Sequence, residues 1–476
     1  MGSLGVVSEN TTKSHLEELF HRQHLNKQHV RQKSTIERIE KIKRIKVWIV
    51  EHRKGIQEAL YKDFRKPFTE TDGTEILPVK VEIDHTIAHL DEWMHPRKVT
   101  TPINLLGSSA YIMYEPKGVV LIMAPWNFPF NLVISPLISA IAAGCCAIIK
   151  PSEITPHTSA LLARMINELF ATNEIAIIEG DSQVAISLLK LPFDHIFFTG
   201  STAIGKLVMK AAAEHLTSVT LELGGKSPVV IDETANIQDT VEKIVWGKFI
   251  NCGQTCVAPD YVFVHKNKEE EFLANLKAVI TSLYGKTEQT PDYARIVSYK
   301  HWERLQHLIQ DALQQGAYLE TGNITDEKDY YISPTVLTRI HPGMQLMQEE
   351  IFGPVLPVLS YDHLNEVVQF ISSKDKPLAL YIFSDNKKDI EYILTHTTSG
   401  GVCINDCVVQ FIHPDLPFGG VNTSGIGKAH GFYGFLAFSN ERAVLKQRVG
   451  YTTIKMLYPP YTKKVKKLIN LALKWL

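Results

Sequence analysis

The chain has 476 residues, which at the usual domain size corresponds to roughly three domains. Hydrophobic residues make up 45% and charged residues 21%, close to the globular average, and this excludes a collagenous or disordered chain. The 50 Lys and Arg nearly balance the 51 Asp and Glu. The formal net charge of -1 therefore gives no overall field that attracts nucleic acid.

Six cysteines in a chain of this length predict free thiols in a reducing compartment, and we expect the cytoplasm. Residues 1–10 lack a basic stretch that leads into an apolar one, so we expect a loose end and no secretory signal. The uncharged stretch 132–149 is about as long as a membrane span. Pro136 and Gly144 interrupt it, which favours a buried helix followed by a buried strand.

The segment from Ser14 to Asp91 has apolar residues at helical spacing with charged residues between them, and it predicts amphipathic helices. Basic residues dominate between Arg31 and Lys46, but no aromatic residues that could stack on bases accompany them. We therefore expect a solvated helix face here and no nucleic-acid site.

From Gly118 onward, short apolar runs alternate with helical stretches. Continuous rather than alternating hydrophobicity predicts strands that are covered on both faces, and hence a parallel sheet between layers of helices. The predicted strands are 119–123, 145–149, 175–179 and 195–198, and the predicted helices are 136–143, 157–169, 183–189 and 203–213.

After Glu222 the same alternation repeats and predicts a second α/β unit. The predicted strands of this unit are 228–231, 261–264, 355–359, 379–383 and 401–404, and its predicted helices are 237–251 and 269–283.

Two turns at predicted strand ends are candidates for binding a dinucleotide. Gly200, Ser201, Thr202, Ala203, Ile204 and Gly205 follow one strand and open a helix, where backbone N–H groups can receive a phosphate. The three-glycine dinucleotide fingerprint is absent, so an ordinary turn is an equal alternative. Lys150 and Glu153 follow another strand and could share ribose hydroxyls, or they could belong to an ordinary helix-start turn.

Cys256 lies just beyond a Gly-containing turn, where a substrate could reach its thiol. A lone cysteine is more often a small core residue than a nucleophile. Cys252 and Cys256, like Cys403 and Cys407, have three residues between them, which raises a four-thiolate zinc site as a rival. Zinc knuckles usually have two intervening residues and these pairs lie in apolar surroundings, so we expect no metal site.

Three polar side chains are further candidates for catalysis or binding. Glu222 lies between leucines before two glycines, where burial would raise its pKa and suit a general base, although a partnered carboxylate at a strand end is the alternative. Asn127 follows the end of the strand at 119–123 and could offer an amide donor to an oxyanion. Glu350 and Phe352 either belong to the ordinary start of a loop or bind a ligand with a carboxylate and an aromatic ring.

Taken together, seven motifs resemble the ordered motif set of the NAD(P)-dependent aldehyde dehydrogenases, over about 300 residues. The motifs are Ala124-Pro125-Trp126-Asn127-Phe128-Pro129, Lys150-Pro151-Ser152-Glu153, Phe198-Thr199-Gly200-Ser201-Thr202, Leu221-Glu222-Leu223-Gly224-Gly225-Lys226, Gly253-Gln254-Thr255-Cys256, Glu350-Ile351-Phe352-Gly353-Pro354 and Pro417-Phe418-Gly419-Gly420. Ala258-Pro259-Asp260-Tyr261 and Tyr458-Pro459-Pro460-Tyr461 resemble the class 3 branch, which includes fatty-aldehyde dehydrogenases.

The resemblance implies an aldehyde dehydrogenase-like fold in three parts. A Rossmann-type cofactor domain would comprise 1–103 and 118–222, and an α/β catalytic domain 223–435. A small β oligomerisation element would comprise 104–117 and 436–450, with strands near 110–114 and 442–446, and a homodimer is expected.

The resemblance also implies residue roles. Cys256 would be the nucleophile, Asn127 and the Cys256 backbone N–H the oxyanion hole, and Glu222 the base that activates water. The dinucleotide would contact Trp126, Lys150, Glu153, the turn 200–205, Glu350 and Phe352. Glu153 would repel a 2′-phosphate and so favours NAD, but class 3 relatives with Glu at this position use both cofactors, so NADP stays open.

The resemblance implies oxidation of an aldehyde, aliphatic of medium to long chain or aromatic, to its carboxylate. A CoA-acylating dehydrogenase is one alternative, although Glu222 argues against it because such an enzyme needs no water-activating base. A non-catalytic structural or binding protein on the same fold is another. A cysteine hydrolase would need a His partner, and none of the 19 His lies in a matching motif.

The tail, residues 451–476, contains an amphipathic basic helix from Lys463 to Leu476. Its apolar residues recur at helical spacing, and five lysines add positive charge without any acid. The helix is too short to span a bilayer. We expect peripheral contact with an anionic membrane surface, and packing on a partner subunit is the alternative.

Overall fold

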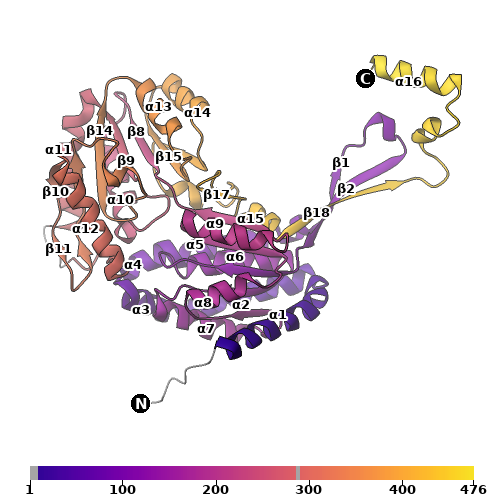
Figure 1. Cartoon of the computed structure of the whole chain (residues 1–476), viewed down its shortest axis with the longest axis horizontal. Coiled ribbons are helices and arrows are strands. Elements are labelled where there is room, and N and C mark those ends of the chain that lie inside the picture. Colours follow the sequence, from indigo (N-terminus) through magenta and orange to yellow (C-terminus); the bar gives the residue numbers. More distant parts are fainter. Residues whose placement is uncertain (1–8, 286–289, 476) are drawn as a thin grey trace.

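The computed structural model describes residues 9–285 and 290–475, so the loose end expected at the start of the chain falls mostly outside the described residues. Two α/β bodies lie side by side, and a three-stranded ribbon projects away from them with the C-terminal helix near its far end (Figure 1). The α/β class predicted from the sequence is confirmed.

The first body is built on a six-stranded sheet in which all strands are parallel except the edge strand β17. In sheet order the strands are β17 (Gly425–Ile426), β7 (Ser218–Leu223), β6 (His195–Gly200), β3 (Val119–Met123), β4 (Cys146–Lys150) and β5 (Ile175–Ile177). Every residue of β3 and β4 is buried, as the continuous apolar runs predict.

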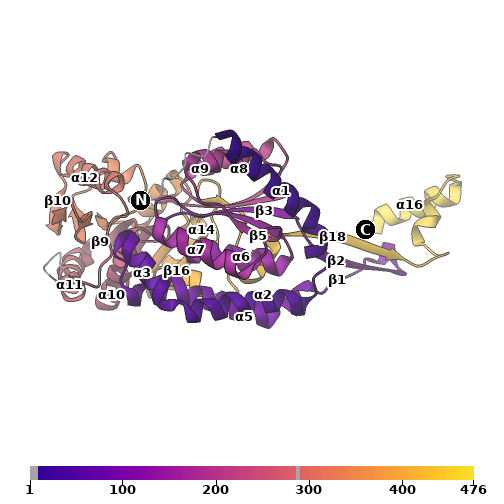
Figure 2. The same cartoon turned by 90° about the horizontal axis from the view of Figure 1, so that it is seen from below.

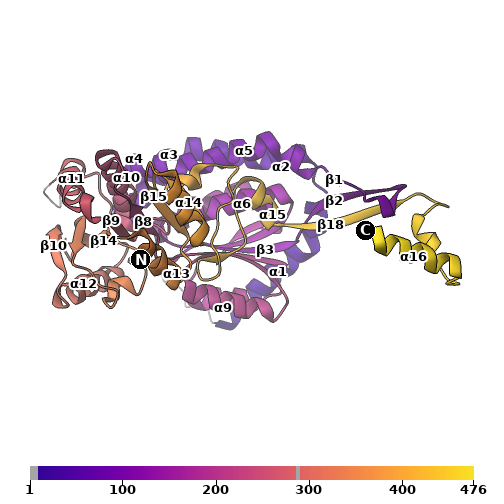
Figure 3. The ribbon, with the colours of Figure 1, turned by 90° about the horizontal axis from the view of Figure 1, so that it is seen from above.

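Helices cover both faces of this sheet (Figures 2 and 3). Alternate residues of β3 face opposite sides, so Leu121 packs with α1 and α8 while Ile122 packs with α2, α5, α6 and α7. The helices of this body are α1 (Glu9–Arg31), α2 (Thr35–Glu51), α3 (Arg53–Phe64), α4 (Phe68–Thr71), the π-helical turn η1 (Asp72–Ile76), α5 (Leu77–Met94), α6 (Asn131–Ala143), α7 (Pro156–Leu169), α8 (Ser182–Leu189), α9 (Thr202–Ala213) and α15 (Gly431–Ala437).

The uncharged stretch 132–149 forms the buried helix α6 and the buried strand β4, which confirms the interpretation from the sequence. α6 ends at Gly144, whose φ of 90° lies in the left-handed region. No helix in the described part of the chain is long and apolar enough to cross a membrane.

The second body is built on a seven-stranded sheet, parallel except for the edge strand β10. In sheet order its strands are β10 (Tyr318–Thr321), β13 (Thr335–Thr338), β14 (Val355–Tyr361), β9 (Tyr261–His265), β8 (Pro228–Ile231), β15 (Ala379–Phe383) and β16 (Gly401–Ile404). Its helices are α10 (Ile237–Phe249), α11 (Lys266–Tyr284), α12 (Tyr299–Gln314), α13 (Leu364–Ser373) and α14 (Lys387–His396). A small hairpin joins β11 (Thr325–Asp326) to β12 (Tyr331–Ile332).

Short 3₁₀ turns connect these elements at η2 (Ile103–Leu105), η3 (Ile250–Gly253), η4 (Gln345–Met347), η5 (Val409–Ile412) and η6 (Thr453–Leu457). Helix α10 ends at Phe249, short of the predicted end at 251. The reason is local, because Asn251 and Cys252 take left-handed φ angles of 53° and 55° that an α-helix cannot accommodate.

The projecting ribbon consists of β1 (Arg97–Val99), β2 (Ser108–Pro116) and β18 (Ser439–Gln447), all antiparallel, with β2 in the centre. Sheet membership departs from the expected domain division at two segments. β1 lies upstream of residue 104 but joins the ribbon, and β17 lies within 223–435 but pairs with β7 of the first sheet.

The tail ends in helix α16 (Lys463–Trp475), as predicted, and this helix lies away from both bodies (Figure 1). Leu468, Leu471 and Leu473 of α16 are exposed.

Candidate active site

An apolar cavity opens between the two bodies, and Cys256 and Glu222 both line it. It encloses about 1020 Å³, including the part that is open to solvent. Large apolar side chains dominate its wall, namely Phe128, Phe197, Trp246, Ile250, Phe411 and Phe418. The structure therefore brings a thiol and a carboxyl group, 34 residues apart in the sequence, to one apolar chamber.

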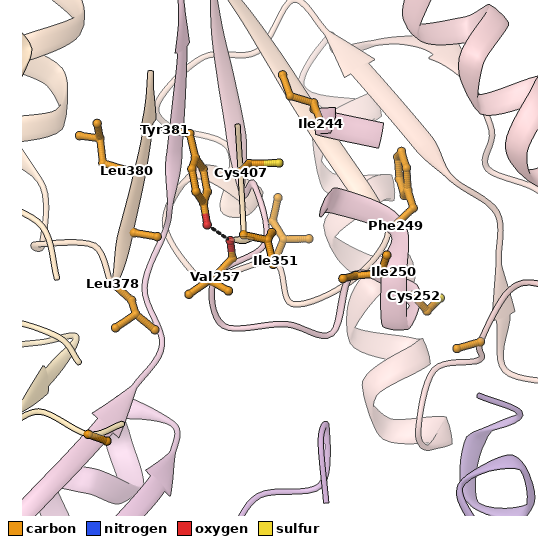
Figure 4. Close-up of a cluster of buried hydrophobic side chains, with 14 of the residues drawn as sticks. Ile244, Phe249, Ile250, Cys252, Val257, Ile351, Leu378, Leu380, Tyr381 and Cys407 are labelled. Carbon is orange, nitrogen blue, oxygen red and sulfur yellow. Dashed lines mark hydrogen bonds between the residues drawn. The ribbon is translucent and has the colours of Figure 1, made fainter. Parts of the chain in front are cut away.

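The loop that bears Cys256 is held by hydrogen bonds on several sides. The Asn251 backbone N–H donates to the Glu70 carboxylate over 2.8 Å. The Gln254 side-chain amide donates to the backbone oxygens of Asn251, at 3.0 Å, and Arg295, at 2.9 Å. On the far side the Tyr381 hydroxyl donates to the Val257 carbonyl within a buried cluster of apolar side chains (Figure 4). The loop is thus fixed to both bodies.

Cys256 is partly exposed to the cavity, whereas Cys252 is fully buried. Burial raises the pKa of the Cys256 thiol well above its ordinary value, and the nearby charges of Glu350 and Glu222 raise it further. The described residues contain no group of three or more His, Cys, Asp or Glu side chains that could hold a metal ion.

Glu222 lies in β7, with its side chain buried against the cavity. Its Oε2 accepts a hydrogen bond from the Thr199 hydroxyl at 3.2 Å, while its Oε1 has no hydrogen-bonding partner within the described chain. Burial raises the pKa of Glu222 to about 7, although Thr199 and Lys428 oppose the shift. A carboxyl with a pKa near neutrality and one oxygen without a partner suits general acid–base chemistry.

Asn127 is buried beside the cysteine loop. Its amide Nδ2 donates to the Gln254 backbone oxygen over 3.1 Å, and the Asn251 amide donates to the Asn127 backbone oxygen over 2.8 Å. The structure thus places the Asn127 amide next to the segment that leads into Cys256.

With this geometry in place, comparison with known proteins identifies the family. The model of the aldehyde dehydrogenase family matches residues 5–444. The chain belongs to the aldehyde dehydrogenase family. It is therefore an enzyme that oxidises aldehydes, and the family is NAD(P)-dependent.

Relatives of this dehydrogenase include proteins of bacteria and mammals. The 4,4'-diaponeurosporen-aldehyde dehydrogenase of Staphylococcus aureus is 44% identical over 430 residues, which cover 90% of this chain and 93% of the relative. Aldehyde dehydrogenase family 3 member A2 of Rattus norvegicus is 40% identical over 425 residues, which cover 89% of this chain and 87% of the relative. The resemblance to the class 3 branch is therefore confirmed.

A solved structure of the substrate-bound state of Staphylococcus aureus AldH matches the fold of this dehydrogenase with a TM-score of 0.92. The two chains are 41% identical, and the match covers 96% of this chain and 99% of the other. The aldehyde dehydrogenase-like fold expected from the sequence is therefore confirmed.

The turns expected to bind the dinucleotide lie at one edge of the first sheet, because β4, β3 and β6 are parallel neighbours. Lys150, at the end of β4, forms an ion pair of 2.5 Å with Glu153. Ser201 caps α9 and accepts the Ile204 N–H at 3.4 Å. A Cβ on Gly205 would lie 2.6 Å from the Leu223 side chain, so glycine lets α9 pack closely on β7.

The other residues expected at the dinucleotide gather between the bodies. The Trp126 and Phe352 rings meet edge to face with centroids 5.3 Å apart. Burial raises the pKa of Glu350 to about 8, and the Gly225 N–H donates to this carboxyl. A Cβ on Gly224 would lie 2.0 Å from Glu350 Oε2, so the glycine makes room for Glu350.

Several residues of this neighbourhood were not among the candidates from the sequence. Thr199 holds Glu222, and Glu70 holds Asn251. Asp260 pairs with Lys226 and accepts the Ile351 N–H at 2.9 Å, which ties the Glu350 segment to the cysteine loop. Asp260 and Lys226 both lie within motifs quoted from the sequence, but nothing in the motifs indicates that they pair.

Proposed function

We propose that this dehydrogenase oxidises aliphatic aldehydes of medium to long chain, or aromatic aldehydes, to carboxylates through a thioester on Cys256. The observation that supports this most is the apolar cavity that Cys256 and Glu222 share. An apolar wall of phenylalanine, tryptophan and isoleucine side chains favours a hydrophobic substrate tail over a charged or sugar-like one.

Cys256 acts as the nucleophile. The thiol loses its proton to water, and the thiolate adds to the aldehyde carbon to form a tetrahedral thiohemiacetal oxyanion. Hydride leaves this tetrahedral carbon more readily than it would leave a carbonyl carbon. The Asn127 amide and the Cys256 backbone N–H stabilise the oxyanion that develops. A bound NAD(P)+ would supply the acceptor for the hydride, whose loss leaves a thioester on Cys256.

Glu222 then activates water for hydrolysis of the thioester. The Oε1 atom without a partner is the oxygen available to accept a proton from water. Thr199 holds the other oxygen and so orients the carboxyl group. Hydrolysis releases the carboxylate and restores the thiol.

The dinucleotide would lie along the strand ends of the first sheet. The first N–H groups of α9 have no partner inside the helix, so those of Thr202 and Ala203 are available to the pyrophosphate. Ile204 is 46% exposed and offers an apolar surface for the adenine ring. Lys150 and Glu153 would hold the adenine ribose, and Glu350 with Phe352 the nicotinamide ribose. Glu153 favours NAD over NADP because it repels a 2′-phosphate.

The ribbon is the proposed dimer contact. β18 is an edge strand with mostly exposed residues, and it leaves one row of backbone groups unpaired. A second copy of the chain that covers this edge would form a homodimer. Sedimentation at micromolar concentration gives twice the chain mass if this is correct, and a monomer mass excludes it.

The helix α16 is proposed to bind anionic membranes from the cytoplasm. Its apolar face is formed by Val465, Leu468, Ile469 and Ala472, which recur at helical spacing, and its lysines attract acidic headgroups. In a liposome flotation experiment, the full chain should therefore float with anionic liposomes, and a truncated protein of residues 1–462 should not. Equal binding by both proteins would exclude this role of the helix.

The test of the function is NADH or NADPH formation from a panel of aldehydes, with each cofactor in turn. Turnover should increase from short to medium and long chains, and Cys256→Ala should abolish it. Cys252→Ala is the matched control, because it removes a neighbouring thiol that does not line the cavity. Substantial turnover by Cys256→Ala would contradict the proposed nucleophile.

A further inference from the structure

His430 is a polar side chain on the wall of the apolar cavity, and the mechanism above does not use it. Its Nδ1 lies 3.1 Å from the Phe411 backbone oxygen. A carbonyl oxygen can only accept a hydrogen bond, so Nδ1 bears the proton. Burial lowers the pKa of His430 to about 4, which keeps the ring neutral at physiological pH. Nε2 is therefore a hydrogen-bond acceptor.

Among the described residues, the Phe411 carbonyl, at Nδ1, is the hydrogen-bond partner of the His430 ring. The ring is also held in place because it stacks on Phe418 with centroids 4.9 Å apart and planes inclined by 11°. Phe418 and Phe411 line the same cavity. The result is a fixed acceptor in a mostly apolar part of the wall, separate from the Glu222 carboxyl.

The backbone at this position is held in a conformation that side chains rarely adopt. His430 has a φ of 71°, and the following Gly431 has a φ of 49°. Both oxygens of the buried Glu82 carboxyl accept the Gly431 N–H, at 3.0 and 3.2 Å. Strain of this kind persists only where the surroundings enforce it, and it concentrates at functional sites. Glu82 thus anchors the turn that presents His430 to the cavity.

We propose that His430 is a specificity residue that accepts a hydrogen bond from a hydroxyl group on the substrate chain, away from the aldehyde carbon. The preferred substrates would be hydroxyl-bearing apolar aldehydes rather than plain alkanals. A substrate hydroxyl would donate to Nε2, while a plain chain that fills the cavity offers this acceptor no hydrogen bond. This inference rests on the proposed function, since it concerns the same cavity and the same reaction.

The test in the wild-type enzyme compares kcat/KM for decanal, a series of decanals with the hydroxyl at successive positions, and their methyl ethers. A hydroxyl donates to Nε2 and a methyl ether cannot. At least one hydroxy isomer should exceed both decanal and its own methyl ether by about fivefold or more. If decanal turns over but no isomer is preferred, the inference fails while the function stands. If no aldehyde turns over, the proposed function fails.

Two variants locate the effect. His430→Phe keeps a ring on Phe418 but has no acceptor, so it should lose the preference for the hydroxyl while it retains turnover of decanal. His430→Gln places an amide oxygen close to the position of Nε2, so it should keep much of the preference. The same preference in His430→Phe would overturn the proposal. If His430→Phe does not fold, the wild-type enzyme alone can still overturn the proposal. It does so if kcat/KM for each methyl ether equals that for the matching hydroxy aldehyde.

Discussion

Cys256 and Glu222 line one cavity, and burial shifts the pKa of both groups upward. For the carboxyl the result is a pKa of about 7, so the protonated and charged forms coexist at physiological pH. For the thiol the result is that the protonated form dominates, chiefly because the group is buried. Glu350 is the neighbour whose charge raises the pKa of Cys256 most.

Alkylation of Cys256 in the absence of dinucleotide tests this environment. Glu350→Gln should lower the pKa of Cys256, because it removes the charge that raises this pKa most, and iodoacetamide labelling at pH 9 should become several-fold faster. Peptide mass spectrometry measures the rate at Cys256 alone. The control is Glu349→Gln, which removes an exposed carboxylate paired with Arg304. Equal rates in the wild-type enzyme and both variants would contradict the proposed electrostatics.

Sequence patterns indicated which residues have useful chemistry but not which of them touch. Cys256, Glu222 and Asn127 each follow a recognisable strand end or turn, so they could be named without a structure. The hydrogen bond between Glu70 and Asn251 joins residues 181 positions apart, and no local pattern predicts it. The strained backbone of His430 is equally invisible, because the turn depends on a carboxyl group in α5.

At the level of elements, the turn between α10 and Cys256 contains three successive left-handed residues, Asn251, Cys252 and Gly253. A Cβ on Gly253 would lie 2.3 Å from the Gly353 backbone oxygen. This close approach places the cysteine loop directly against the segment that follows Glu350. The glycine is needed here for its φ of 73° and also for the absence of a side chain.

A matched pair of substitutions separates these two requirements. Gly316 has a left-handed φ of 98°, but the space where a Cβ would lie is open. Gly316→Ala should therefore lower the free energy of unfolding by about 1 kcal/mol and leave activity unchanged. Gly253→Ala should cost more and lower kcat at least tenfold, because the Cβ displaces the loop. Urea unfolding and steady-state kinetics measure both. Similar effects of the two changes would show that the contact with Gly353 is unimportant.

The buried parallel strands were the most predictable elements. The ranges 119–123, 228–231 and 379–383 match β3, β8 and β15 at both ends, because strands covered on both faces leave continuous apolar runs. The range 401–404 also matches β16, although this edge strand is only partly buried. No prediction covered α12 or the hairpin of β11 and β12. Each strand of that hairpin has only two residues, so its sequence lacks an apolar run.

For the whole molecule, buried carboxyls make stability depend on pH. Burial raises the pKa of Glu82 and Glu222 to about 7 and of Glu350 to about 8, from an ordinary value of 4.5. Their contribution to stability is therefore complete below pH 4.5 and is lost as the pH rises through 7 to 8. Lowered histidine pKa values act in the opposite direction, but only below pH 6.5.

The free energy of unfolding should therefore fall between pH 6.5 and 8. Glu222→Gln removes one of the titrating carboxyls, so its stability relative to the wild-type protein should improve over this range by on the order of 1 kcal/mol. Urea unfolding at four pH values measures the difference. Glu270→Gln, at an exposed position near the start of α11, is the control and should show no such trend. A wild-type stability that rises from pH 6.5 to 8 would contradict the assignment.

The three parts of the molecule have separate tasks in this account. The first sheet ends where the dinucleotide is proposed to bind, the second body supplies the cysteine loop, and the ribbon extends beyond both. The apolar cavity lies between the bodies, so the reaction depends on their arrangement as well as on single residues.

The central claim is that an acyl group passes through Cys256 and leaves by the action of Glu222. Mixing Glu222→Gln with NAD+ and a long-chain aldehyde tests it directly. The account predicts a rapid burst of about one NADH per active site, slow turnover afterwards, and an acyl thioester on the Cys256 peptide by mass spectrometry. If Glu222→Gln turns over at the wild-type rate without a burst, or if the acyl group is found on any residue other than Cys256, the account is contradicted.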